Sequence, residues 1–170
     1  MDKNLEQERV EALRVGLRGG ADDGRFAVLA RAALARAGDS RPAKTTMKIQ
    51  GTDGKVLWKG KARSIGEAVE LAVASGTPLN GANLPGADLS GKNLVKAQFI
   101  GANVEGANFD DSDLTDANLM RANARRASFC GAKMIGTNLR VADLGGSDLW
   151  DADMEGADTN GTNLKGVNME

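Results

Sequence analysis

The chain contains few residues that could act as catalysts or metal ligands. Its 170 residues include no histidine, no tyrosine and a single cysteine, Cys130. Without histidine, the chain lacks the usual base at neutral pH and the commonest protein ligand for metals. We therefore expect no catalytic activity, no metal site and no cofactor.

Cys130 is the residue whose side chain is most able to act as a nucleophile. Arg125 and Arg126 precede it, and neighbouring positive charge lowers the pKa of a thiol and makes it more reactive. A single cysteine cannot form an intramolecular disulfide, which fits a reducing compartment. The N-terminus has no apolar run of a secretory signal, and no segment approaches the roughly 18 apolar residues that spanning a membrane requires. We expect a cytoplasmic protein, bacterial in style.

The carboxylates are unevenly distributed along the chain. Residues 77–170 carry 13 acidic and 8 basic residues, whereas residues 1–76 carry 10 acidic and 14 basic residues. The second part therefore has a net charge of −5 and the first part +4. Local acidic surface, rather than overall charge, is the feature that could attract a partner.

A repeat of five residues positions these carboxylates. From Thr77 the chain divides into nineteen consecutive groups, each of five residues except the last, which has four. The third place is apolar in nearly every group, the first is usually small, the second is mostly Asn or Asp, and the fifth is often Gly. Ala124 is undersized and Thr159 is polar for the third place. A period of five fits neither an α-helix nor a straight strand, so the chain must turn in every group, with the first and third places facing inward.

The pattern A-[DN]-L-x-x, as in Ala82-Asn83-Leu84 and Ala87-Asp88-Leu89, resembles the pentapeptide-repeat family. The resemblance covers residues 77–170 and implies a right-handed quadrilateral, or four-sided, β-helix solenoid with four groups per coil. Residues twenty apart should then stack. The expected fold class is mainly β, with an N-terminal α/β cap made of helical segments and a ββα unit.

The first half of the chain divides into two further segments. Residues 1–46 are predicted to be a helical segment and linker, because residues 4–38 show two apolar stripes at helical spacing. An alternative is that the basic, amphipathic residues 25–37 contact a membrane surface or an acidic partner. Residues 47–76 are predicted to be a ββα capping unit. Asp53-Gly54 marks its turn, and Ser64 with Glu67 forms a capping box before a helix that ends near Gly76.

Stacking at twenty residues predicts which carboxylates are compensated. Glu105 should lie beside Arg125, Lys96 beside Asp116, and Lys133 between two aspartates. The carboxylates left over, with an exposed aromatic anchor, are the predicted partner-binding residues: Asp110, Asp111, Asp148, Asp151, Asp158 and Trp150. No capping helix follows Met169-Glu170 in the sequence, so an exposed edge favours a homodimer through the C-terminal coils.

The family resemblance also suggests a function. Some pentapeptide-repeat proteins resemble duplex DNA in width and charge and bind topoisomerases in its place, protecting bacteria against quinolones. We therefore predict a non-catalytic protein-binding module, a DNA mimic that occupies the nucleic-acid channel of a DNA-handling enzyme such as a topoisomerase or a phage-defence complex. The alternative is a structural scaffold or self-assembling rod whose N-terminal helices recruit a partner. Direct binding of nucleic acid or membrane is not expected.

Overall fold

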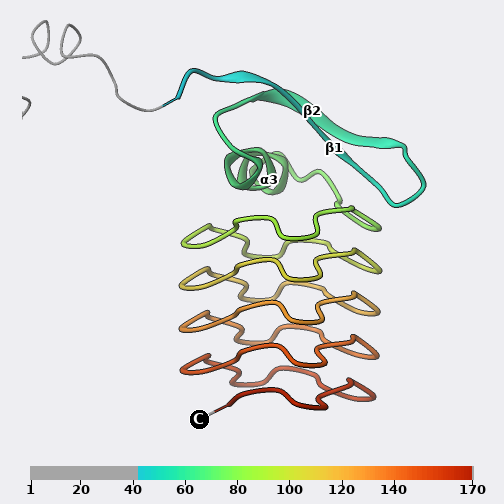
Figure 1. Cartoon of the computed structure of the whole chain (residues 1–170), viewed down its shortest axis with the longest axis vertical. Coiled ribbons are helices and arrows are strands. Elements are labelled where there is room, and N and C mark those ends of the chain that lie inside the picture. Colours follow the sequence, from blue (N-terminus) through green and yellow to red (C-terminus); the bar gives the residue numbers. More distant parts are fainter. Residues whose placement is uncertain (1–41, 170) are drawn as a thin grey trace, which may run out of the picture. The chain divides into compact units, whose positions relative to one another are not determined.

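The computed structural model describes residues 42–169. The helices predicted within residues 4–38 and the amphipathic segment 25–37 lie outside these residues. The described part begins with an antiparallel hairpin of β1 (Thr45–Gln50) and β2 (Val56–Ala62). Helix α3 (Ile65–Ala74) follows, and the remaining residues form stacked coils beneath it (Figure 1).

The hairpin and helix form where the sequence predicts them. Gly54 has a φ of +79° in the turn, a conformation that glycine adopts without strain. Ser64 is the N-cap, and its hydroxyl accepts a hydrogen bond from the Glu67 N–H at 3.1 Å. The Glu67 carboxylate accepts from the Arg63 N–H at 2.7 Å. Strand β1 begins at Thr45, paired with Ala62, so the segment predicted as a linker already contains two strand residues.

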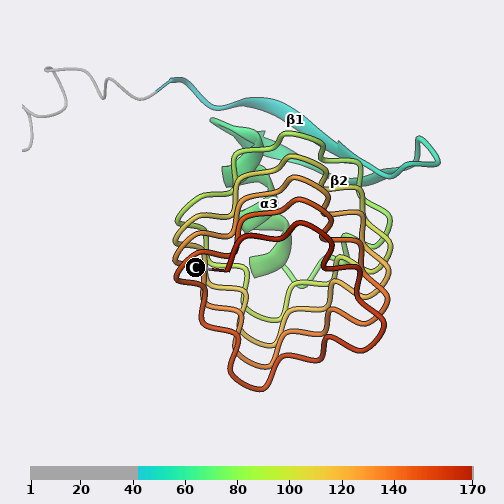
Figure 2. The same ribbon diagram turned by 60° about the horizontal axis from the view of Figure 1, so that its bottom comes forward.

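The predicted coil of four groups is confirmed. Second-place residues form parallel β-bridges with the residue twenty positions later, from Asn83 with Asn103 to Asp148 with Asn168. An oblique view from below shows the four-sided outline of the coils (Figure 2). We name the sides by their groups. Side A contains residues 77–81, 97–101, 117–121, 137–141 and 157–161; side B, 82–86, 102–106, 122–126, 142–146 and 162–166; side C, 87–91, 107–111, 127–131 and 147–151; and side D, 92–96, 112–116, 132–136 and 152–156.

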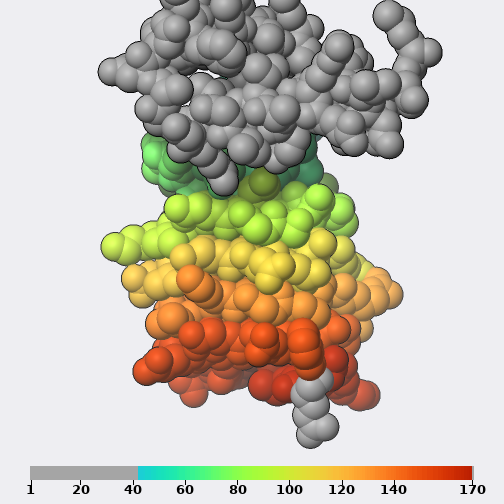
Figure 3. Space-filling view, turned by 90° about the vertical axis from the view of Figure 1, so that its left-hand side faces the viewer, coloured from blue at the N-terminus to red at the C-terminus, as the bar shows by residue number. Residues whose placement is uncertain are grey.

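The interior is filled by first-place and third-place side chains, as predicted. Phe109 and Phe129 are fully buried and stack with ring centroids 4.9 Å apart, and Phe99 meets Phe109 edge-on. Ala124 is also fully buried. Successive coils appear as tightly stacked layers in the space-filling view (Figure 3).

The last described coil departs from this interior pattern. Leu164 is 40% exposed, Met169 is 59% exposed, and Thr159 is also exposed. Their third-place side chains point into the coil, but no described coil lies beyond them to cover them.

The ββα unit satisfies backbone groups of the first coil. From Asn103 to Asn168, every second-place N–H donates to a carbonyl of the preceding coil. In the first coil, the Asn83 N–H donates to the Gln50 carbonyl of β1 at 2.8 Å, and the Asn93 N–H donates to Glu70 Oε1 of α3 at 3.1 Å. Pro78 occupies another second place and has no N–H to satisfy. The hairpin and helix therefore cap the coil.

Candidate protein-binding face

Side C carries most of the uncompensated negative charge of the coil. Within its groups it has five carboxylates and no lysine or arginine. These are Asp88, Asp110, Asp111, Asp148 and Asp151. Sides A, B and D each contain at least two basic residues. The acidity of residues 77–170 is therefore a property of one face.

The structure brings together five of the six predicted partner-binding residues. Asp110, Asp111, Asp148, Trp150 and Asp151 all lie on side C, in groups two coils apart. Asp88, which the sequence reasoning did not include, lies on the same side. The sequence could have placed Asp88 on this side, because it holds the second place of its group and lies twenty residues before Asn108.

Asp158 is different, and its inclusion among uncompensated carboxylates was wrong. It lies on side A, opposite side C, and its Oδ2 is 3.2 Å from Arg140 Nη1. The hydrogen bond from the Asn160 N–H, together with Arg140, lowers the pKa of Asp158. The sequence reasoning paired only residues twenty apart, whereas Arg140 reaches diagonally to a residue eighteen positions later.

Hydrogen bonds hold three of the side C carboxylates in place. Asp88 Oδ1 accepts from the Ser90 N–H at 3.2 Å and from the Ser90 hydroxyl at 2.7 Å. Asp110 Oδ1 accepts from the Cys130 N–H at 3.0 Å and from the Ser128 hydroxyl. Asp148 Oδ1 accepts from the Trp150 N–H and from Asn168 Nδ2, both at 3.0 Å. Trp150 itself is 54% exposed. Side C therefore presents fixed negative charge beside an exposed aromatic side chain.

The surroundings of Cys130 disfavour a reactive thiol, although Arg125 and Arg126 precede it in the sequence. A hydrogen bond with Ser128 lowers the pKa of the thiol, but burial and the charges of Asp148 and Asp110 outweigh it, so the pKa is raised. Arg125 and Arg126 do not act on Cys130, because they pair with Asp143 and Glu105 on side B. A raised pKa reduces the fraction of nucleophilic thiolate at neutral pH.

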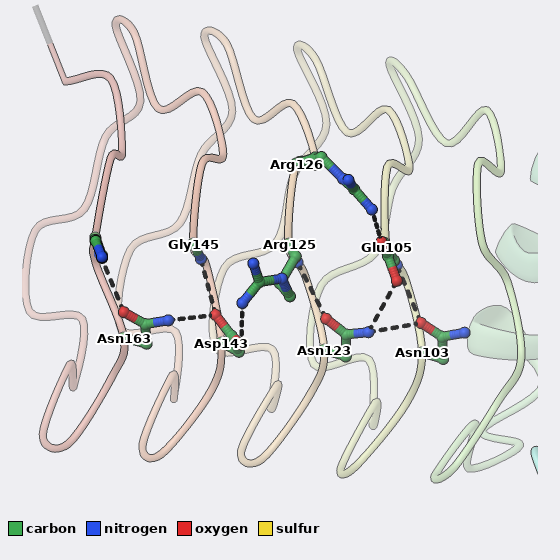
Figure 4. Close-up of polar contacts among 9 residues, drawn as sticks. Asn103, Glu105, Asn123, Arg125, Arg126, Asp143, Gly145 and Asn163 are labelled. Carbon is green, nitrogen blue, oxygen red and sulfur yellow. Dashed lines mark hydrogen bonds and ion pairs between the residues drawn. The ribbon is translucent and has the colours of Figure 1, made fainter.

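On side B, hydrogen bonds and ion pairs compensate the carboxylates of Glu105 and Asp143 (Figure 4). Second-place amides form a ladder, in which Asn103 donates to Asn83 at 3.0 Å and Asn123 donates to Asn103 at 3.2 Å. Asp143 interrupts the ladder because a carboxylate cannot donate. Arg125 Nη1 bonds Asp143 Oδ2 there, at 3.1 Å.

The predicted stacking at twenty residues is confirmed, but the ion pairs expected from it do not form. Within residues 42–169, Lys133 pairs with neither Asp113 nor Asp153. Glu105 pairs with Arg126 instead of Arg125, and contacts with Arg126 and Asn123 lower the pKa of Glu105. Among residues 42–169, no ion pair joins Lys96 to Asp116. Long side chains at the corners reach a diagonal neighbour more readily than the residue directly stacked on them.

Within the described part of the chain, no group of three potential ligands is placed to hold a metal ion. No helix in residues 42–169 is long and apolar enough to cross a membrane.

Comparisons with known proteins agree with this architecture. The family model for pentapeptide repeats (8 copies) matches residues 75–111, 112–151 and 132–170. Proteins of this family fold as right-handed quadrilateral β-helices. No curated protein sequence matches the chain.

Two solved structures illustrate the similarity. HetL, a pentapeptide repeat protein involved in heterocyst differentiation regulation from the cyanobacterium Nostoc sp. strain PCC 7120, is 32% identical with a TM-score of 0.50, over 51% of this chain and 40% of that chain. AT2G44920, a pentapeptide repeat protein from the Arabidopsis thaliana thylakoid lumen, is 32% identical with a TM-score of 0.54, over 56% and 66%. The match thus spans less than two thirds of either protein.

Proposed function

Because this chain belongs to the pentapeptide-repeat family, we propose that it is a non-catalytic protein-binding module whose side C engages a positively charged protein surface. In its finer form, the proposal is DNA mimicry: side C occupies the nucleic-acid channel of a DNA-handling enzyme. A cytoplasmic location belongs to the same proposal, because a lone cysteine suits a reducing compartment.

The observation that carries the proposal is the segregation of charge onto side C. Asp88 and Asp148 are three coils apart, which at about 4.8 Å per coil is about 14 Å. Five carboxylates in that length approach the charge density of one DNA strand, about one charge per 3.4 Å. The group 127–131 between them carries no acid, so the charge forms two clusters along the face.

The mechanism would be competition for a basic channel. The aspartates would replace phosphates in ion pairs with lysine and arginine of the partner, and Trp150 would supply an apolar anchor of the kind that binding hot spots favour. Attraction between such surfaces raises the association rate and weakens with added salt. Binding should therefore fall steeply as salt rises, because the Debye length is only about 8 Å at physiological ionic strength.

The test compares two neutralised variants that remove the same number of carboxylates. The side C variant carries Asp110→Asn, Asp111→Asn, Asp148→Asn and Asp151→Asn. The side D control carries Asp113→Asn, Asp116→Asn, Asp153→Asn and Glu155→Gln. Asparagine already occupies many second places and tolerates positive φ, so both variants should fold, which circular dichroism verifies.

We expect the intact protein and the side D control to inhibit DNA supercoiling by a purified type II topoisomerase, and the side C variant to lose this inhibition. Equal loss in both variants would show that bulk acidity rather than side C matters. If the intact protein does not inhibit, topoisomerase mimicry is wrong, and capture from a lysate with the same variants tests the broader binding proposal. If the intact protein, the side C variant and the side D control all capture the same proteins, the proposal that side C binds a protein partner is refuted as well.

The scaffold alternative is supported by the apolar side chains exposed in the last described coil. Leu164 and Met169 are the surface that a homodimer through the C-terminal coils would cover. Light scattering at micromolar concentration tests it: the dimer proposal requires twice the monomer mass, and conversion to monomer by Leu164→Lys. A monomeric intact protein would contradict it.

A further inference from the structure

Side B contains a hollow of about 360 Å³. It lies between Arg125 and Arg126 of one coil and Lys165 and Gly166 of a later coil. The intervening group ends in Gly145-Gly146, which leaves the fourth and fifth places without side chains. A Cβ at Gly145 would lie 3.1 Å from Asp143 Oδ1, 3.2 Å from Asn163 Nδ2 and 3.5 Å from Arg125 Nη1, so a side chain there would crowd the polar groups beside the hollow.

Arg125, Arg126 and Lys165 line this hollow, and both arginines are paired with carboxylates. The Arg126 guanidinium extends away from the hollow, toward Glu105 of the preceding coil, so only its aliphatic stem borders the space (Figure 4). Arg125 Nη1 bonds Asp143 Oδ2, and Arg126 Nη2 pairs with Glu105 Oε1. A guanidinium has five N–H donors, and each of these recorded contacts uses one nitrogen. Lys165 forms no ion pair with any described carboxylate. The hollow therefore offers the guanidinium of Arg125, which Asp143 holds in place, and one uncompensated ammonium group.

We propose that this hollow binds a phosphate group. Guanidinium groups match phosphate oxygens with paired, charge-assisted hydrogen bonds, and a lysine adds a point charge. The volume lies at the small end of the usual range for ligand pockets, about 300–1,000 Å³. Because Asp143 already orients Arg125, this side chain has little conformational freedom left to lose on binding.

The surrounding charge favours a single phosphate group over a nucleic acid strand. Arg126 is the last residue of its side B group, and side C, with five carboxylates and no cation, follows it directly. A polyanion extending from the hollow across this corner would meet that negative face. A phosphorylated side chain of a partner protein and free phosphate present the same chemistry, and either could occupy the hollow.

The experiment follows the backbone amide NMR signals of Gly145, Gly146 and Gly166 in the full chain. Inorganic phosphate, a phosphoserine peptide, its unphosphorylated form and a single-stranded oligonucleotide are titrated separately at matched ionic strength. The test variant is Lys165→Gln and the control is Lys96→Gln. Both lysines are exposed and without a recorded ion pair, but Lys96 lies on side D.

We expect saturable shifts of the three glycine amides with inorganic phosphate, weakened about tenfold by Lys165→Gln, because a charge-assisted contact is lost, and unchanged by Lys96→Gln. Additional binding of the phosphopeptide, but not of its unphosphorylated form, would identify a protein source; phosphate without phosphopeptide binding would identify the free ion. The absence of saturable shifts, or equal weakening in both variants, would overturn the proposal. Tighter binding of a single-stranded oligonucleotide than of the phosphopeptide would overturn it in favour of nucleic acid.

Discussion

At the residue scale, the corners of the coil place one residue per group at positive φ. Most fifth places are glycine, but Val141 has a φ of 57° and is 58% exposed. A β-branched side chain in this conformation is strained, at a cost of about 1–2 kcal/mol for a non-glycine residue. Val141 gains little burial in return.

We predict that Val141→Gly raises the free energy of unfolding by about 1 kcal/mol, because relief of strain exceeds the entropy cost of glycine. Urea unfolding measures the change. Gly86→Val is the matched control, since Gly86 has a φ of +64° and a Cβ there would meet nothing within 4 Å. It should destabilise by a similar amount. A stabilising Gly86→Val or a destabilising Val141→Gly would show that corner strain is not the dominant effect.

A second prediction at this scale concerns the acid sensitivity of Asp143. Its pKa lies below the ordinary value of 3.8, because it accepts from the Gly145 N–H and contacts Arg125 and Asn163. A lowered carboxyl pKa gives stability that is present above the unfolded-state value and is lost as pH falls through the folded value. Asp143→Asn should keep the amide ladder but remove this titration.

We therefore expect Asp143→Asn to be slightly less stable than the intact protein near neutral pH. The difference should shrink as the pH falls below about 4. Urea unfolding of both proteins at neutral pH and at a pH below about 4 measures this difference in stability. A difference that does not change with pH would mean that the Asp143 charge contributes nothing to folding.

At the element scale, helix α3 lies so close to the first coil that one position admits only glycine. A Cβ on Gly66 would lie 2.4 Å from the Asp88 carbonyl oxygen, which is backbone and cannot move away cheaply. In an exposed helix, alanine would instead be favoured over glycine by roughly 0.5–1 kcal/mol.

Gly66→Ala should therefore destabilise the protein by about 1–3 kcal/mol, through overpacking between α3 and the coil. Thermal or urea unfolding measures the loss. Leu71→Ala on the same helix is the control; because Leu71 is 37% exposed, its effect should be clearly smaller. A Gly66→Ala variant as stable as the intact protein would mean that the helix does not pack this closely on the coil.

At the scale of the whole molecule, the sequence predicts the repeated coil and its cap but misses the ion pairs between diagonal neighbours on adjacent coils. The apolar residues at a period of five predict the coil, because they fill a single interior. Asp53-Gly54 and Ser64 predict the hairpin and the helix, because turns and helix caps depend on local conformation. Ion pairs depend on the reach of long side chains. Arg140 with Asp158 and Arg126 with Glu105 span 18 and 21 residues, so stacking at twenty misassigned them. The grouping of aspartates on side C could be predicted, because an aspartate side chain is too short to reach another side of the coil.

Concentrating negative charge on one face should also affect folding. The carboxylates of side C have no cation on their own side, whereas those of side D lie among Lys92, Lys96 and Lys133. Like charges that face one another destabilise the compact state, and salt screens them. Residues retained for binding often reduce stability in this way.

The side C variant, Asp110→Asn, Asp111→Asn, Asp148→Asn and Asp151→Asn, should accordingly be more stable than the intact protein at low salt, by about 1 kcal/mol, and the gain should shrink as ionic strength rises. The side D control should show no gain, because neutralisation there removes attraction to the lysines as well as repulsion. Thermal unfolding across a salt series measures both. A gain equal in the two variants would assign the effect to net charge. A side C variant that is no more stable at low salt would mean that its carboxylates repel one another too weakly to affect folding.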